Sequence, residues 1–212
     1  SLSAQQRADY DSLLACIAAN KLQKPAGKSA RAYYEKLVTS GLPEAFNLLV
    51  TRKLIAALQK RGQEVLHNLI VLDENSNRSY RLDGEIASNL KYSAELLGKD
   101  HYLYQPTLAK YYYFLSYTYY LKDRYAEDDS LLNLAIGAVN KAIVIDSTVA
   151  EFWRAKGLYL SMQYREEESL KAKMKALSLA PERASLYATV GFQYALLKNY
   201  NKARSYLDTA II

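Results

Sequence analysis

Apolar side chains recur at helical spacing over almost the whole chain. Leu13 and Ile17 belong to a first apolar stripe, which a turn containing Pro and Gly follows. Pro43 suits the first turn of a helix that we expect to run to about residue 60, because its fixed φ and missing N–H are tolerated there. Gly62 is expected to separate this helix from a shorter one over residues 65–72. No stretch alternates apolar and polar residues convincingly over strand length, so the pattern predicts an all-α fold.

Capping residues and polar breaks divide the rest of the first half into further helices. Ser29 can cap a helix whose inner face carries Tyr34 and Leu37. A polar loop over residues 73–79 precedes a helix that carries Ile86 and Leu90. We therefore expect residues 1–105 to form helical hairpins.

The last third of the chain contains an internal repeat with a period of about 34 residues. Each repeated pair is aromatic, small or apolar in both copies: Trp153, Gly157, Leu160, Ser169, Ala176 and Leu177 recur as Tyr187, Gly191, Tyr194, Ala203, Ala210 and Ile211. Upstream, Ala135 and Ala142 lie 34 residues before Ser169 and Ala176, which is one repeat. The residues that match Trp153, Gly157 and Leu160 lie 41 residues before them, and they are Tyr112, Ser116 and Tyr119. The difference indicates a seven-residue insertion, which we place in the loop over residues 122–129.

These residues resemble the signature of the tetratricopeptide repeat (TPR) family, which has the same order and spacing. Small residues such as Gly157 and Gly191 allow two helices of a hairpin to approach closely. The resemblance implies an α-solenoid of antiparallel hairpins, with three repeats over about 107–149, 150–183 and 184–212. Residues 1–105 would be degenerate TPR-like hairpins stacked in the same solenoid. Lys173 departs from the pattern, because a large apolar residue is common at its position.

Composition narrows the class of protein further. Of the 212 residues, 50% are hydrophobic and only 8 are Gly and 4 are Pro, which disfavours a turn-rich β fold. The net charge of +6 is spread over both halves, so we expect a mild preference for acidic partners and no nucleic-acid binding. No apolar run is long enough to span a bilayer, and we expect no direct membrane insertion. The start at Ser1 suggests that the chain is part of a longer protein.

Candidate catalytic and ligand-binding motifs are incomplete. Gly27, Lys28 and Ser29 match the end of a phosphate-binding loop, but the first Gly of that motif and a preceding strand are missing. The loop over residues 73–77 has the first calcium-ligand spacings of an EF-hand without its turn Gly or closing carboxylate. Cys16 falls on an apolar stripe, and only two His are present. We therefore expect no catalytic, cofactor-binding or metal-binding residues.

Tyrosine is the unusual feature of the composition, because nine of the 20 Tyr lie between residues 102 and 125. The TPR resemblance accounts for Tyr112 and Tyr119 as packing positions, and it places the neighbouring stripe of the same helix in a concave groove. Extending this stripe through the repeats gives a candidate partner-binding groove: Lys110, Tyr113, Tyr117, Tyr120, Glu151, Arg154, Leu158, Ser161, Ala188 and Phe192. The alternative is that the three groove tyrosines pack on the first 100 residues.

The sequence therefore predicts a non-enzymatic protein-interaction module that holds a protein or peptide segment in an aromatic groove. Lys110 and Arg154 would orient polar or acidic groups of that partner. A second interpretation is a structural, dimerisation or regulatory segment of a larger bacterial signalling protein, one that is membrane-anchored or linked to a kinase. The stretch 25–34 resembles the opening hairpins of bacterial TPR-like regions in such proteins. The last helix lacks a polar cap in sequence, which suggests self-association through it.

Overall fold

The computed structural model of the chain describes residues 2–71, 79–126 and 129–211, and the calcium-like loop at 73–77 lies outside these residues. The described part contains helices and turns and no strand. The helices, in chain order, are α1 (Ala4–Ala18), α2 (Ala30–Thr39), α3 (Glu44–Ile70), α4 (Tyr80–Leu97), α5 (Tyr104–Ala126), α6 (Asp129–Ile145), α7 (Ala150–Met162), α8 (Glu166–Leu179), α9 (Ala184–Leu196) and α10 (Tyr200–Ile211). The predicted all-α solenoid is confirmed.

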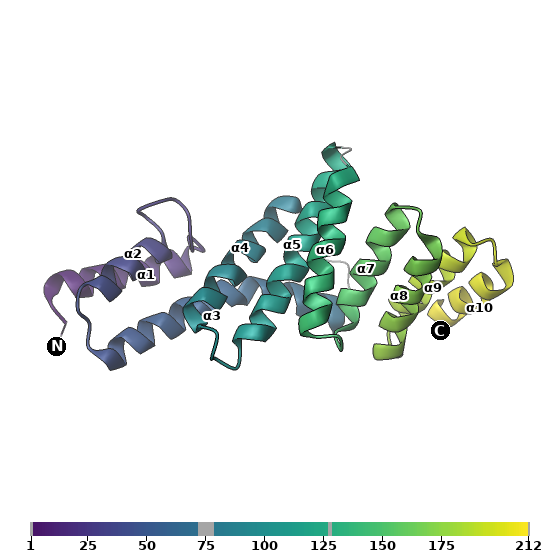
Figure 1. Cartoon of the computed structure of the whole chain (residues 1–212). Helices are drawn as coiled ribbons and strands as arrows, with labels where there is room; N and C mark the ends of the chain where they lie inside the picture. Colours follow the sequence, from purple (N-terminus) through teal and green to yellow (C-terminus); the bar gives the residue numbers. More distant parts are fainter. Residues whose placement is uncertain (1, 72–78, 127–128, 212) are drawn as a thin grey trace.

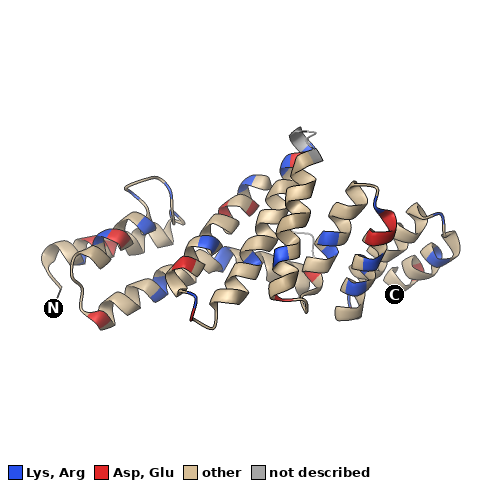
Figure 2. Ribbon diagram, in the orientation of Figure 1, with Lys and Arg blue, Asp and Glu red and all other residues tan. Residues whose placement is uncertain are grey.

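Successive helices pack as antiparallel hairpins in an elongated array, with the two termini at opposite ends (Figure 1). Lysine, arginine and acidic residues are scattered along the whole array, and the first turn of α8 carries three glutamates (Figure 2). Ser29 caps α2 as predicted, because its hydroxyl accepts a hydrogen bond from the Ala32 N–H. No helix in the described ranges is both long and apolar enough to cross a membrane.

The predicted break at Gly62 is wrong, because α3 runs without interruption through it. Gly62 is a contact residue: a Cβ atom there would lie 3.1 Å from Ile86 and 3.5 Å from Phe114. The absence of a side chain therefore lets α3 lie close to α4 and α5. A glycine that brings two helices together and a glycine that ends a helix look the same in a sequence.

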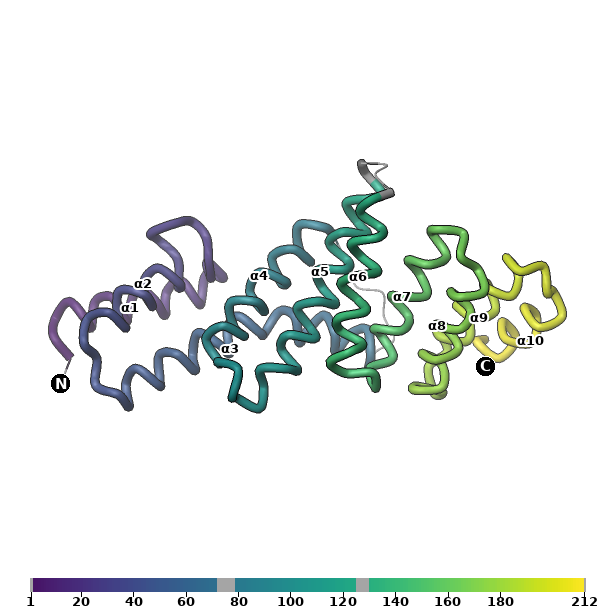
Figure 3. The backbone as a smooth tube through the Cα atoms, in the orientation of Figure 1, coloured from purple at the N-terminus to yellow at the C-terminus, as the bar shows by residue number. Residues whose placement is uncertain are grey.

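The seven-residue insertion does not form the loop that we expected, because α5 continues to Ala126. This helix has 23 residues, whereas α7 and α9 have 13 each. The hairpin of α5 and α6 therefore projects beyond its neighbours (Figure 3).

The repeat positions behave as helix-contact positions. At Gly157 an added Cβ would lie 2.7 Å from the side chain of Lys173, and at Gly191 it would lie 2.7 Å from Leu207. Ser116 takes the equivalent place on α5, where its hydroxyl lies 3.0 Å from that of Tyr159 on α7. Lys173 and Leu207 occupy the same position of consecutive repeats, so the stem of the lysine fills the space that a leucine fills one repeat later.

Candidate interaction surface

The tyrosine stripe of α5 is buried. Tyr113 is fully inaccessible, and Tyr117 and Tyr120 are only 5% and 9% exposed. The rings form an aromatic cluster with α7, in which Tyr113 lies 5.4 Å from Phe152 and Tyr117 lies 5.8 Å from Tyr159, between centroids. The expectation that these three side chains form an exposed groove wall is therefore not met in this structure, and they occupy core positions.

The far end of α3 covers this part of the repeats. Val65, Leu66 and Leu69 belong to the same buried core cluster as Tyr113 and Tyr117. Figure 1 shows α3 passing behind α4 and α5 toward α7. These contacts agree with the alternative that the tyrosines pack on the first 100 residues, and they extend it to α7.

A buried ion-pair network fixes the end of α3 against the repeats. Arg183, in the turn before α9, donates one hydrogen bond to the carbonyl of Leu69 at 2.7 Å and another to the carboxylate of Glu151. Arg154 also donates to Glu151 at 2.8 Å, and it reaches the Tyr117 hydroxyl at 3.3 Å. The Glu151 carboxylate therefore balances two arginines inside the protein.

Arg154 is consequently committed to internal partners. Burial alone would lower its pKa, but the neighbouring Tyr117 and Glu151 outweigh burial and raise the pKa well above its ordinary value. Arg154 therefore stays charged and paired with Glu151. The structure does not support the expectation that Arg154 orients an acidic partner. Lys110 is half-buried, one turn before Tyr113 on α5.

No protein-family model matches this chain, and no curated protein matches it in sequence. Solved structures do match its fold. A crystal structure of the MamA protein superposes with a TM-score of 0.56 at 16% identity, covering 97% of this chain and 90% of that one. A thermophilic TPR protein from Thermus thermophilus gives a TM-score of 0.53 at 15% identity, with 97% and 90% covered. The chain has a TPR-like helical-repeat fold.

The predicted groove positions of the last two TPR-like hairpins divide into a buried and an exposed part. Glu151 is buried at the start of α7, but the same face of that helix becomes more accessible toward its end, through Leu158 and Ser161 to Met162. On α9, Ala188 is half-buried and Phe192 is 63% exposed. One end of the predicted groove is therefore closed by α3, and the other end is open.

The open end contains two apolar residues that the sequence-based set omits. Met162 lies four residues after Leu158, and Leu196 lies four residues after Phe192, so each shares a helix face with its predecessor. Met162 is 43% exposed and Leu196 is 56% exposed. The i+4 spacing would have identified both. We call Leu158, Met162, Phe192 and Leu196 the open stripe.

A buried polar network lies directly beneath Phe192. The Lys173 ammonium donates to the side-chain oxygen of Gln193 at 2.6 Å, and Gln193 in turn donates to the backbone carbonyl of Glu166 at 3.0 Å. Ser169 donates to the carbonyl of Gly157 at 2.7 Å. Burial lowers the pKa of Lys173 to about 8, although Glu166 partly opposes the shift. The network joins α7, α8 and α9, which positions α9 and hence Phe192.

The last helix presents a polar outer face. Its exposed residues include Lys202, Arg204, Asp208 and Thr209, while Tyr206 and Leu207 are half-buried. Tyr206 stacks on Tyr194 with ring centroids 5.4 Å apart. This face has the character of a solenoid cap, contrary to the expectation from the sequence, although Ile211 is 84% exposed at the end of α10. Self-association through α10 stays a prediction.

Proposed function

We propose that this chain is a non-enzymatic protein-interaction module and that the open stripe on α7 and α9 binds an apolar segment of a partner protein. The observation that carries the proposal is the exposure of Phe192 and Leu196, which lie one turn apart on the same face of α9. Large apolar side chains grouped on a surface are typical of interaction sites. The segment of α3 that covers the other end of the groove is an internal example of the ligand that we expect.

The contacts of α3 indicate what such a ligand needs. Val65, Leu66 and Leu69 supply apolar side chains from one face of a helix, and the Leu69 carbonyl at the helix end receives a hydrogen bond from Arg183. Leu66 and Leu69 are three residues apart and Val65 and Leu69 are four apart, which are spacings that an amphipathic helix laid in a groove uses for its apolar anchors. We therefore expect the partner segment to be an amphipathic helix whose apolar face covers Phe192, Leu196 and Met162.

Affinity for selected peptides tests the proposal. A displayed peptide library is selected on the intact chain, and the best peptide is then titrated against Phe192→Ser/Leu196→Ser. Burial of a large apolar side chain contributes about 1.5–3 kcal/mol, so the double variant should bind at least about tenfold more weakly. The matched control is Tyr102→Ser/Val144→Ser, which removes two exposed apolar side chains elsewhere.

The two variants separate the proposal from non-specific binding. Equal loss of affinity in both double variants would show that the peptide recognises general hydrophobicity and would contradict the proposal, as would unchanged affinity in Phe192→Ser/Leu196→Ser. Light scattering over a concentration series distinguishes a peptide-binding monomer from the dimerisation arm that the sequence leaves open. A dimer dissociated by the Phe192→Ser/Leu196→Ser variant would assign the open stripe to self-association.

A further inference from the structure

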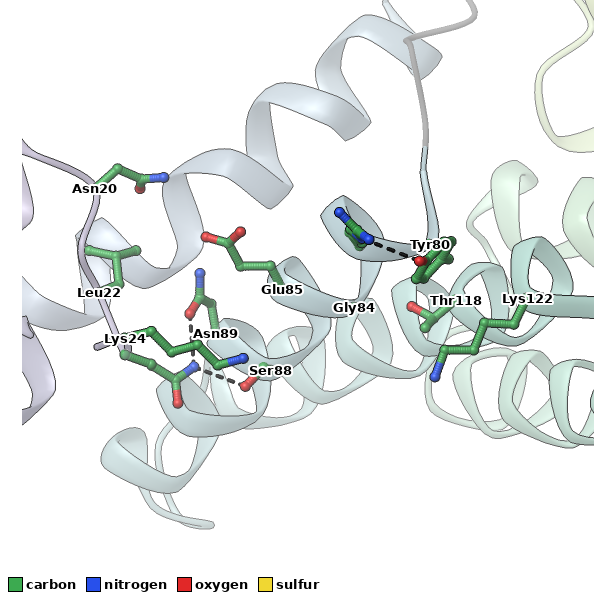
Figure 4. A pocket seen from close by; sticks show the side chains of 12 residues that line it. Asn20, Leu22, Lys24, Tyr80, Gly84, Glu85, Ser88, Asn89, Thr118 and Lys122 are labelled. Atoms are coloured by element: carbon green, nitrogen blue, oxygen red, sulfur yellow. Dashed lines mark hydrogen bonds between the residues drawn. The ribbon is translucent and has the colours of Figure 1, made fainter. Parts of the chain in front are cut away.

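A pocket lies far from the open stripe, between the segment that joins α1 to α2 and the adjoining faces of α4 and α5. The pocket has a volume of about 500 Å³. Its polar lining includes Gln23, Lys24, Arg81, Asn89 and Lys122 (Figure 4). This volume lies within the range of about 300–1,000 Å³ that small-molecule sites occupy.

The floor of the pocket is held by hydrogen bonds between two distant segments. The Gln23 side-chain nitrogen donates to the Asn89 side-chain oxygen at 2.8 Å and to the Ser88 hydroxyl at 3.1 Å. Asn89 is almost fully buried, so its amide is fixed in place. The Asn89 oxygen is used by Gln23, and Figure 4 shows its NH₂ group directed away from Gln23, on the side of Glu85. The floor therefore offers a pre-positioned hydrogen-bond donor.

The walls carry an excess of positive charge. Lys24 and Lys122 have no ion-pair or hydrogen-bond partner in the described ranges of the chain, and Figure 4 shows them entering the pocket from opposite sides. Arg81 adds a third cation, held by a hydrogen bond of 3.2 Å to the Tyr80 hydroxyl. Among the described lining residues Glu85 is the one acidic side chain, and Figure 4 shows its carboxylate on the side of Leu22 and Asn89.

From this geometry we propose that the pocket binds a small dicarboxylate, one carboxylate group near Lys24 and the Asn89 amide and the other near Lys122. Two ammonium groups on opposite walls match two separated anionic groups better than one compact anion. Both lysines are exposed, so their attraction is that of partly solvated charges and depends on ionic strength. Donors outnumber acceptors in this lining, which is the pattern that carboxylate oxygens require.

Calorimetric titration of the intact chain tests this proposal. The probes are succinate, glutarate and adipate, with acetate and inorganic phosphate as controls at equal ionic strength. At least one dicarboxylate should bind saturably and more tightly than acetate or phosphate. A charge contact of this kind contributes about a factor of five in affinity, so Lys24→Gln and Lys122→Gln should each weaken binding by about that factor and the double variant by about 25-fold.

The matched control is Lys175→Gln, which removes an exposed lysine from α8 and should leave the affinity unchanged. Circular dichroism of each variant establishes that the fold is retained. Three results would overturn the proposal: no saturable binding of any dicarboxylate, binding of phosphate as tight as that of the best dicarboxylate, or equal affinity in Lys24→Gln/Lys122→Gln and Lys175→Gln.

Discussion

Raising the pH from about 7 to about 9.5 should stabilise the folded chain through Lys173. Its side chain is only 8% exposed, and burial lowers its pKa to about 8 from the ordinary value of 10.5. In this interval the native state releases the proton while the unfolded state keeps it. Because the unfolded state then binds more protons than the native state, the free energy of unfolding increases with pH.

The size of the effect follows from the two pKa values. Well below pH 8 both states are protonated and the native state carries the full cost of a buried charge. Integrated from about pH 7 to 9.5, the difference in bound protons between the unfolded and native states amounts to about 1.4 pH units. The free energy of unfolding therefore increases by about 2 kcal/mol. For a chain of this length the midpoint of thermal unfolding should rise by about 4–8 °C. The hydrogen bond to Gln193 survives, since a neutral amine still donates.

Thermal unfolding followed by circular dichroism, with Lys173→Met beside the natural chain, isolates this contribution. The variant keeps an unbranched side chain, one atom shorter, and removes the titrating group, so the difference between the two pH profiles belongs to Lys173. The interval also ends below the pKa of tyrosine, and burial raises that of Tyr92 to about 12. Parallel profiles for the two proteins would refute the reasoning, because the rise would then come from other groups.

Three further substitutions test the packing. Tyr113→Ala should lower the free energy of unfolding by about 3–5 kcal/mol, as measured by urea denaturation, because the ring is fully buried. Glu151→Gln should lower the free energy of unfolding by about 3–5 kcal/mol in the same assay, since it leaves two inward-facing arginines without their counter-charge. Glu167→Gln, in the exposed first turn of α8, should leave the free energy of unfolding unchanged. Gly157→Ala should destabilise the chain by about 1–3 kcal/mol, because the added Cβ atom would meet a neighbouring helix. Gly137→Ala should instead stabilise it by up to about 1 kcal/mol, because an added Cβ atom there has no neighbour within 4 Å and alanine favours a helix over glycine.

Each outcome separates a contact from a general effect of substitution. A neutral Tyr113→Ala would show that the aromatic cluster between α5 and α7 does not hold these helices together. Equal stability of the Glu151 and Glu167 variants would mean that the buried carboxylate does not balance the arginines. Equal effects of alanine at the two glycines would contradict the close approach at Gly157.

The repeat spacing was sufficient to predict the C-terminal hairpins. Each signature residue acts through its immediate neighbours, as Gly157 does with Lys173 and Gly191 with Leu207, so the period of the repeat carries the information. The same spacing identifies Phe192 as a concave position, and the structure leaves it exposed. Features that depend on contacts within a repeat or with the next one could therefore be predicted from the sequence.

The path of α3 depends on contacts between distant segments and could not be predicted from the sequence. Its apolar face over Val65, Leu66 and Leu69 predicts a helix with a buried stripe, but nothing in the spacing says which surface covers that stripe. The tyrosine stripe of α5 has the same ambiguity, because large aromatic residues suit both a groove wall and a core. The two ambiguities have one solution, in which both stripes are buried in the same core cluster together with Phe152 and Tyr159 of α7.

This shared core cluster has a consequence for how the repeats are held. Arg183 is separated from Leu69 by 114 positions, yet it donates a buried hydrogen bond to that carbonyl and another bond to Glu151. Residues 106–212 alone would lose the Leu69 carbonyl and the part of the core cluster that Val65, Leu66 and Leu69 supply. The repeats therefore rely on α3 for both apolar cover and hydrogen bonding. The open stripe lies beyond that cover, where Phe192 is exposed, and this is why we place the proposed partner there.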